Sequence, residues 1–349
     1  MRSLAVPFLD RLTFSTKQVT ALRAIGEYRG KQQLYTQQTP QILEDLRTAA
    51  MIESVVSSNR LEGITAAHHR IEALVLKPTT PTNRSEEEIA GYRDALEEIH
   101  GHSERLPVND NTLLHFHDMI NRYTAELGGH WKRRDNVILE RHKDGTQRVR
   151  FRPVPAAETP SAIAQLVDAY DLALHQDKRE PLVVIPLTIL DFLCIHPFED
   201  GNGRCSRLLM LLLLYHFGYD VGRYISIERV IEQSKKTYYE TLEASSKNWH
   251  QGRHDPHPWL NYSWGVLIAA YKEFADRVGT IQTARGSKTE RVRADIGRRL
   301  GPFAISDIER DCPTVSRDMI RVVLNQMRDE GLVELHGKGR GAKWEKVNK

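Results

Sequence analysis

The stretch from His196 to Arg207 reads HPFEDGNGRCSR and concentrates residue types that can do chemistry. Strongly apolar segments flank it on both sides, so packing alone does not explain its polar groups. Gly201 and Gly203 come just before a leucine-rich segment, where glycine N–H groups and the N-terminus of a new helix favour an anion. The stretch therefore predicts an anion pocket beside the protein core.

Charged side chains in the same stretch predict that the anion is a polyphosphate. Arg204 and Arg207 are three residues apart and share one helix face, and guanidinium groups bind phosphate oxygens in a fork. Asp200 can hold Mg²⁺, which proteins bind through one or two carboxylates together with substrate phosphates. His196 lies within reach, where a neutral imidazole can take a proton from an attacking hydroxyl. A zinc pair of His196 and Asp200 is the weaker interpretation, because no third ligand is evident.

The twelve residues resemble the signature HPFx[DE]GNGRxxR of the Fic family at every defined position. The resemblance implies transfer of AMP from ATP to a Ser, Thr or Tyr hydroxyl of a target protein, or of the chain itself. It implies that His196 is the general base and that Asp200 binds Mg²⁺. The implied nucleotide-binding set comprises Gly201, Asn202, Gly203, Arg204 and Arg207.

Two tyrosines downstream of the signature complete the implied nucleotide site. Tyr238 and Tyr239 are similar to the aromatic wall of the family's adenine site. The resemblance is looser here, because Ser246 stands where the family often has an Asn. We therefore expect Tyr238 and Tyr239 to bind the adenine of ATP.

A β-hairpin interrupts the helical pattern of the sequence. Residues 136–140 and 148–151 are rich in β-prone side chains, and Lys143-Asp144-Gly145 between them is a turn signal. The residues alone leave two interpretations equal: a plain surface loop, or a strand edge that offers main-chain groups to a partner. Asn136, Val137 and Ile138 resemble the family's flap, which aligns the main chain of the target.

A second short motif, Ser58-x-x-x-Glu62-Gly63, precedes the signature in the chain. It resembles the inhibitory motif [ST]xxxE[GN] of Fic proteins that are inhibited from the N-terminal side. The resemblance implies that Glu62 pairs with Arg207, occupies the partner of the γ-phosphate and leaves ATP in an unproductive pose. The ordinary alternative is an exposed Glu at a helix end before a terminal Gly.

Composition places the chain among ordinary globular proteins. It has 349 residues and a net charge of +3, and its three cysteines form no CxxC pair, which fits a reduced, cytoplasmic setting. Its longest apolar run is far shorter than the ~20 residues that span a bilayer, so no membrane partner is expected. The N-terminal residues lack the pattern of a signal peptide.

The sequence predicts a mainly α fold, with a Fic helical core, a β-hairpin flap and a small C-terminal winged-helix domain. Expected helices cover 16–29, 41–62, 66–76, 84–100, 108–123, 160–175, 186–195, 203–216, 227–246 and 259–279. The expected domains are an N-terminal helical region with the inhibitory helix over 1–105, the catalytic core over 106–280 and the winged helix over 281–349.

The tail from residue 281 onward carries 15 basic and 10 acidic residues. Ser306-x-x-Glu309 indicates a capping box, and Ser316 indicates the cap of a second helix that reaches about Asp329. A hairpin with a basic tip follows, which completes the order of a helix-turn-helix with a wing. The residues expected to contact DNA are Arg317, Arg321, Lys338, Arg340 and Lys343. Protein contacts or dimerisation are the alternative use of such a domain.

Three functions stay open at this point. The first is AMP transfer to a protein hydroxyl. The second is a transcriptional regulator that senses nucleotide and binds DNA; the intact His196 speaks against it, because a sensor needs no base. The third is a hydrolase that removes AMP from a target, with Glu62 orienting water in the same pocket. The expected partners are a target protein, DNA through the tail domain, and a second copy of the chain.

Overall fold

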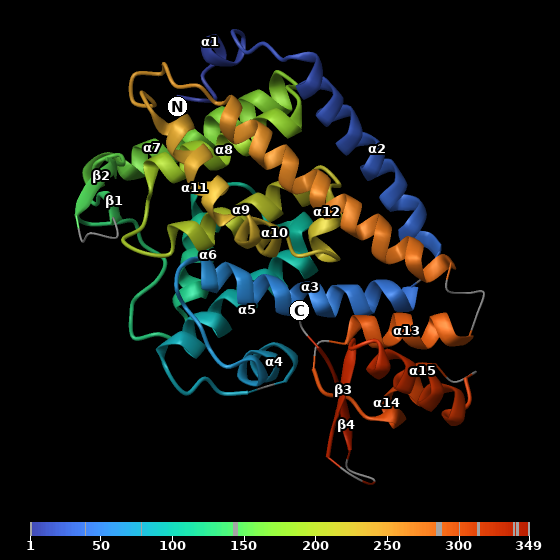
Figure 1. Cartoon of the computed structure of the whole chain (residues 1–349). Helices are drawn as coiled ribbons and strands as arrows, with labels where there is room; N and C mark the ends of the chain where they lie inside the picture. Colours follow the sequence, from blue (N-terminus) through green and yellow to red (C-terminus); the bar gives the residue numbers. More distant parts are fainter. Residues whose placement is uncertain are drawn as a thin grey trace. The chain divides into compact units, whose positions relative to one another are not determined.

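The computed structural model describes residues 2–38, 40–77, 79–141, 146–283, 288–299, 301–312, 315–337, 339 and 342–347. The chain divides into two compact units, Met1–Tyr271 and Lys272–Lys349. Helices dominate both units, and the described strands form two separate two-stranded antiparallel sheets (Figure 1). The mainly α prediction is confirmed.

The first unit contains a series of helices and one hairpin. The helices before the hairpin are α1 (Val6–Leu9), α2 (Thr16–Gln38), α3 (Pro40–Leu61), α4 (His68–Leu76), α5 (Arg84–His102) and α6 (Asp110–Asn121). The helices after it are α7 (Thr159–Asp171), α8 (Pro181–Ile195), α9 (Asn202–His216), α10 (Ile227–Gln233), α11 (Lys235–Ser246) and α12 (His257–Thr283). The first unit includes α12 as far as Tyr271.

Side-chain caps fix where several of these helices begin. The side chain of Asn83 accepts a hydrogen bond from the backbone of α5, and that of Asn109 does the same for α6. Ser226 caps α10 by accepting from Arg229 N at 3.0 Å. Each cap satisfies an N–H group that has no partner inside the helix, which is worth about 1 kcal/mol.

Helices α8 and α9 form the core of the first unit. Every residue of α8 from Leu182 to Ile195 is buried, and α9 is buried at most positions from Asn202 to Tyr215. Helices that are apolar on all sides need cover on all sides. Helices α7 and α11 pack on α8, and α3, α5 and α6 pack on α9 (Figure 1). The turn between α8 and α9 therefore lies on a rigid base.

The start of α8 differs from the prediction. The sequence places the start at Pro186, but the helix begins at Pro181 and continues through Pro186. A proline inside a helix lacks the N–H that would bond to the carbonyl four residues earlier. Here that carbonyl, on Leu182, accepts a hydrogen bond of 2.7 Å from Trp264 Nε1. A contact from α12 thus compensates the backbone bond that Pro186 cannot make.

The expected helix over 227–246 is wrong as a single element. It is divided into α10 and α11 at Ser234, whose backbone is non-helical at φ −112° and ψ 26°. The Ser234 hydroxyl bonds back to Val230 O at 2.9 Å and also contacts Tyr262 OH at 2.8 Å. Back-bonding of this kind competes with the helix, and it lets α11 take a different direction from α10.

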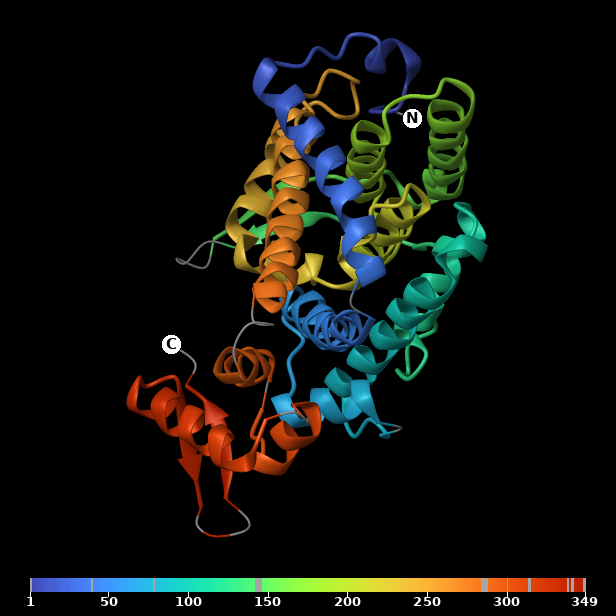
Figure 2. The same ribbon diagram turned by 90° about the vertical axis from the view of Figure 1, so that its right-hand side faces the viewer.

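Helix α2 runs along the first half of α12 (Figure 2). Gln18 Nε2 donates to Asn261 Oδ1 at 3.0 Å near one end of the contact. Tyr28 stacks on Tyr271 near the other end, with ring centroids 5.8 Å apart.

The predicted hairpin is present as strands β1 (Ile138–Arg141) and β2 (Gln147–Phe151). Leu139 faces Val149 across the ladder, and the register shifts between Ile138 and Leu139. Asn136 and Val137 were expected inside the strand, but they precede it. The expected turn, Lys143 to Gly145, lies outside the described residues.

The second unit has its own apolar core. Its elements are the end of α12 followed by α13 (Lys288–Arg298), α14 (Ile305–Asp311), α15 (Arg317–Asp329), β3 (Val333–His336) and β4 (Lys343–Lys346). The second tail helix buries one apolar face, which carries Ile320, Val323, Leu324 and Met327. Phe303 pairs with Trp344 through two backbone hydrogen bonds, of 2.8 and 2.7 Å.

The predicted capping box at Ser306 is wrong. Helix α14 begins at Ile305 with Ala304 as its N-cap, and Asp307 Oδ2 accepts from Ala304 N at 2.9 Å. The acid at the third helical position closes the helix end without Ser306, which lies inside the helix. Ser316 does cap α15 as expected, accepting from Met319 N at 3.5 Å.

Across the described part of the chain, the search for a bilayer-spanning helix, judged by length and hydropathy, found none.

The buried leucines of α9 should contribute to the free energy of unfolding of the first unit. Leu212 is 0% exposed, so we expect Leu212→Ala to lower the free energy of unfolding by about 2–5 kcal/mol, because it leaves a cavity. Leu127 is 82% exposed, and Leu127→Ala should change that free energy by less than about 0.5 kcal/mol. Urea unfolding followed by circular dichroism measures both, and equal losses would contradict the assignment of α9 to the core.

Candidate active site

His196 forms the turn that leaves α8. It is the C-cap of the helix and adopts a left-handed backbone, φ 52° and ψ 63°, which is uncommon for a residue other than glycine. Its ring nitrogen Nδ1 lies 3.3 Å from Leu193 O. A carbonyl can only accept, so Nδ1 carries the proton and the lone pair of Nε2 is available in the neutral ring.

The environment of His196 keeps the imidazole neutral. Burial lowers the pKa of His196 to about 4, and the positive charge of Lys132 acts in the same direction. The backbone contact with Leu193, together with the charges of Glu62 and Asp200, opposes this shift without cancelling it. At pH 7 the ring is therefore in the form that can act as a base.

Two glycines shape the N-terminus of α9. Gly201 has φ +79°, and a Cβ at this position would lie 2.6 Å from Ile120 Cδ1. A Cβ at Gly203 would collide with Glu62 Oε1. The left-handed backbone favours glycine at Gly201, and the missing side chain at Gly203 leaves room for the Glu62 carboxylate. An anion does approach the N-terminus of α9, and it is the carboxylate of Glu62.

Arg207 holds that carboxylate. Its Nη2 lies 2.8 Å from Glu62 Oε1 and donates to Ser58 O at 2.9 Å, and its Nε donates to Ser58 Oγ at 2.8 Å. The Arg207 side chain is only 2% exposed. The structure thus brings together Ser58 and Glu62 at the end of α3 with Arg207 on α9, while Gly63 follows with φ +82°.

Helix α3 is fixed by further contacts at its end and in its middle. Lys235 Nζ donates to Leu61 O at 2.9 Å, next to Glu62. One helical turn before Ser58, Ser54 Oγ donates to the buried carboxylate of Glu228 at 2.8 Å. These contacts hold the position of Glu62 through α10 and α11.

Arg204 points to a different part of the structure. Its Nη1 lies 2.7 Å from Glu88 Oε2 on α5, and its Nη2 lies 3.2 Å from Asp200 Oδ2. Its side chain is 2% exposed. We expected Arg204 and Arg207 to act side by side on phosphates, but Arg204 is placed to orient Asp200.

Asp200 is the candidate metal ligand. Its side chain is 72% exposed and faces Arg204. The described residues hold no group of three or more His, Cys, Asp or Glu that could bind a metal ion. Mg²⁺ does not require such a cage, because it keeps several waters and uses one or two carboxylates with substrate phosphates. One accessible carboxylate beside an anion pocket fits that ion.

Asn202 is engaged by the turn itself. Its Oδ1 accepts from Phe198 N at 2.9 Å, and its Nδ2 donates to Phe198 O at 2.8 Å. The Phe198 ring is stacked on His117, with centroids 3.9 Å apart. Asn136, expected in the flap, also bonds to this turn, because its Nδ2 donates to Phe198 O at 3.1 Å.

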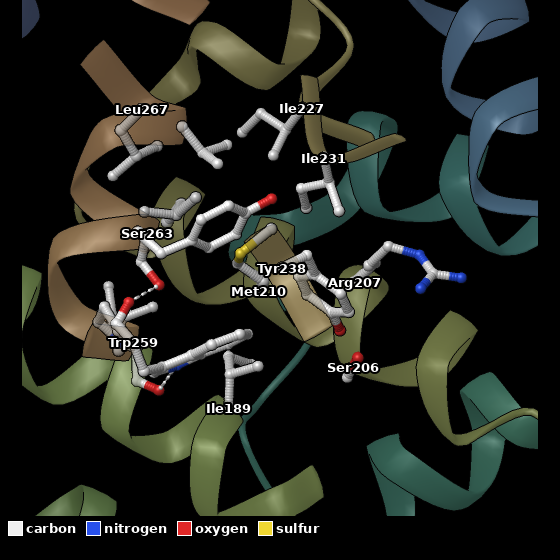
Figure 3. Close-up of a pocket in the computed structure, with 15 residues that line it drawn as sticks. Ile189, Ser206, Arg207, Met210, Ile227, Ile231, Tyr238, Trp259, Ser263 and Leu267 are labelled. Carbon is white, nitrogen blue, oxygen red and sulfur yellow. Dashed lines mark hydrogen bonds between the residues drawn. The ribbon is translucent and has the colours of Figure 1, made fainter. Parts of the chain in front are cut away.

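The two tyrosines have different surroundings. Tyr238 is 4% exposed and packs against Trp259 and Tyr262, at the wall of an apolar cavity of about 30 Å³. Figure 3 shows that the Arg207 guanidinium points away from this cavity. Tyr239 is half-buried, and the Arg150 guanidinium lies 5.4 Å from its ring centroid.

The hairpin is attached to α11 beside Tyr239. Arg150 Nη2 donates to Tyr239 O at 2.5 Å, and Arg148 Nη2 lies 2.8 Å from Glu243 Oε1. Val137, Leu139 and Val149 are exposed on the hairpin. The flap is thus held next to one expected adenine residue, and it keeps an apolar surface in solvent.

Sequence reasoning missed three parts of the site. Glu88, the partner of Arg204, belongs to α5 and is more than 100 residues away in the chain. Glu228 and Ser54, which bond to each other, are likewise more than 100 residues apart in the chain. Lys132 had no role assigned, although it bonds directly to the turn. No local signal marks such pairs, because each depends on tertiary contact.

Comparison with known proteins agrees with these features. The profile of the Fic/DOC family matches residues 107–214. A Fido domain-containing protein of Dictyostelium discoideum is 28% identical over 123 residues, which cover 35% of this chain and 80% of that protein. A protein adenylyltransferase Fic of Nematostella vectensis is 25% identical over 209 residues, which cover 56% of this chain and 44% of that protein. The chain thus matches less than half of the length of that adenylyltransferase.

Solved structures share the fold. A Fic family protein from Desulfovibrio desulfuricans superposes with a TM-score of 0.60 at 21% identity, over 97% of this chain and 98% of that one. A Fic domain containing signaling protein from Bacteroides thetaiotaomicron gives a TM-score of 0.61 at 24% identity, over 71% of this chain and 94% of that one. The HPFEDGNGRCSR signature lies inside residues 107–214, the segment that matches the Fic/DOC family profile.

Proposed function

We propose that the chain transfers AMP from ATP to a Ser, Thr or Tyr hydroxyl of a target protein. The observation that supports this most is a neutral His196 whose Nε2 is available beside the glycine-lined N-terminus of α9. Nε2 takes the hydroxyl proton while the hydroxyl oxygen bonds to the α-phosphorus of ATP. The bond from that phosphorus to the bridging oxygen breaks, so AMP is attached to the target and pyrophosphate leaves.

The phosphates of ATP would bind where α9 begins. Backbone N–H groups at Gly201 and Gly203 and the helix N-terminus favour negative charge there. Arg207 would contact the terminal phosphate, and Arg204 would orient Asp200. Asp200 would hold Mg²⁺, which supplies neutralisation of phosphate charge when it is bound.

The remaining groups would position the two substrates. Tyr239 lies at the flap and offers its ring to adenine, while Tyr238 supports it from the interior, with ring centroids 5.0 Å apart. Strands β1 and β2 form a two-stranded sheet whose edges can accept an extended segment of the target. The supporting observation is the attachment of Arg150 and Arg148 to α11, which keeps the hairpin beside the nucleotide site.

The same site contains its own inhibitor in this proposal. Glu62 and Ser58 occupy the hydrogen-bonding groups of Arg207 that a phosphate would need. The Glu62 carboxylate also fills the space next to Gly203. A triphosphate would therefore find Arg207 already paired and would be repelled by the negative charge of Glu62. Activity thus requires displacement of Glu62.

Other expectations stay predictions from the sequence. DNA binding by the second unit is one of them: Arg317 pairs with Glu309 at 2.8 Å and Arg321 with Asp318 at 3.5 Å, so phosphate binding would require these ion pairs to exchange. Lys338 and Arg340 lie outside the described residues, while Lys343 begins β4. The winged-helix class, a homodimer, nucleotide sensing and removal of AMP also stay predictions.

Removal of the inhibitory carboxylate tests the proposal directly. We expect Glu62→Gly to raise self-labelling with radiolabelled ATP by roughly 5- to 150-fold, because Arg207 becomes available to phosphate. The isosteric Glu62→Gln loses the charge but keeps the shape. Its self-labelling rate should lie between those of the unaltered chain and Glu62→Gly. In the Glu62→Gly background, His196→Ala should lower the rate by about 10²- to 10⁴-fold. Equal labelling of all four proteins would refute AMP transfer through this site.

The pH dependence follows from the state of His196. The pKa of His196 is lowered to about 4, so the base form predominates above that value and is lost as pH falls through it. At ATP concentrations far below saturation, where the rate reports the free protein, we expect the labelling rate of Glu62→Gly to be constant between about pH 6 and pH 8 and to fall below about pH 5. A midpoint near the ordinary histidine value, about 6.5, would show that the imidazole is not held neutral by burial.

The role of Asp200 predicts the dependence on Mg²⁺. In the Glu62→Gly background, Asp200→Asn should raise the Mg²⁺ concentration required for half-maximal labelling, because the only proposed protein ligand is weakened. The exposed Asp118 on α6 offers a control, since Asp118→Asn should leave that concentration unchanged. An unchanged Mg²⁺ requirement in Asp200→Asn would remove Asp200 from the proposed site.

A further inference from the structure

The backbone at His196 needs support from outside the turn. A residue other than glycine in the left-handed region is strained and persists only where the surroundings over-determine it. His196 has φ 52° and ψ 63°, and its Nδ1 contact with Leu193 O is long, at 3.3 Å. Its own hydrogen bond is therefore too weak to hold the ring and backbone in place.

Lys132 supplies contacts on both sides of His196. Its Nζ donates to Ile195 O, the carbonyl just before His196, at 3.0 Å. Its backbone N donates to Pro197 O, the carbonyl of the residue after His196, at 2.8 Å. One residue therefore bonds to the carbonyls of both chain neighbours of His196.

Asn136 extends the same support by one residue. Its Oδ1 accepts from Lys132 Nζ at 3.0 Å, and its Nδ2 donates to Phe198 O at 3.1 Å. The Phe198 ring lies between His117 and Trp131, with centroids 3.9 and 5.4 Å away. Together, Lys132 and Asn136 bond to the carbonyls of residues 195, 197 and 198.

The buried ammonium of Lys132 indicates that its hydrogen bonds, and not packing alone, account for a lysine at this position. It is 3% exposed, and a buried ammonium is costly unless hydrogen bonds compensate it. An apolar side chain of the same length would fill this space at lower cost. Burial lowers the pKa of Lys132 to about 8, and the charge of Asp135 opposes this shift, so the amine keeps its proton and its donors at pH 7.

We propose that Lys132 and Asn136 are positioning residues that hold His196 in the backbone and tautomer required of a general base. Their polar groups bond to the turn carbonyls and not to the nucleotide pocket, so they act through His196. The role in catalysis rests on the proposed AMP transfer, whereas the role in fixing the tautomer does not.

The tautomer of His196 can be measured without any substrate. We expect ¹⁵N chemical shifts of Glu62→Gly at pH 7 to show a proton on Nδ1 of His196. In Lys132→Met, added to that background, Ile195 O loses its side-chain donor, so the Nδ1–H form should lose its dominance. Lys132→Arg retains a charged donor and should therefore keep a larger share of the Nδ1–H form than Lys132→Met. Arg133→Met, at an exposed neighbouring position, serves as the control and should leave the ¹⁵N shifts unchanged.

Kinetics separates positioning from simple loss of structure. Lys132→Met should lower the labelling rate at saturating ATP by about 10- to 100-fold, as small misplacements of a catalytic group do, and should leave the ATP concentration for half-maximal rate within about twofold. Asn136→Asp, which keeps the acceptor for Lys132 but loses the donor to Phe198 O, should show a smaller loss.

Two results would overturn the proposal. The first is a folded Lys132→Met protein with an unchanged His196 tautomer and rate. The second is a changed half-maximal ATP concentration at an unchanged maximal rate, which would assign Lys132 to substrate binding. If Glu62→Gly transfers no AMP at all, the proposed function fails, and the ¹⁵N shifts still decide whether Lys132 fixes the tautomer.

Discussion

A single buried charge limits what this site can do. The Arg207 guanidinium is 2% exposed, and a buried charge without a partner costs several kcal/mol. Arg207 must therefore be paired at all times, and the available partner is the carboxylate of Glu62 at 2.8 Å. A phosphate can take this place only when the carboxylate leaves. In the proposed function, inhibition and nucleotide binding are thus two uses of the same charge.

The rest of the first unit determines which partner Arg207 meets. Helix α9 carries Arg207 within the core. Helix α3 carries Glu62, and polar contacts such as Arg229 Nε to Glu53 Oε2 at 2.8 Å fasten it to α10. On the opposite side of the site, hydrogen bonds from Lys132 hold the turn with His196. In the proposed function, a base held in place and an inhibitory residue on a separate helix would allow release without disturbance of the catalytic groups.

The sequence was informative where function depends on a short contiguous stretch. The turn at Gly201 follows from its place before the leucine-rich helix, and the Glu62–Arg207 contact followed from a motif resemblance. Prediction failed where a distant residue decides the outcome. Trp264 lets α8 continue through Pro186, and Tyr262 contacts Ser234 where α10 ends. Helix spacing also gives no sign of Glu88, the acidic partner of Arg204 on α5.

Competition for Arg207 can be measured most directly by isothermal titration calorimetry of nucleotide binding. In the presence of Mg²⁺, the account predicts that Glu62→Gly binds ATP more tightly than the unaltered chain, by about 10-fold or more for a coupling of 1–3 kcal/mol. AMP, which lacks the phosphates that reach Arg207, should bind equally to both proteins. Equal affinity of ATP for the two proteins, or an equal gain for AMP and ATP, would contradict the claim that Glu62 occupies the place of a phosphate.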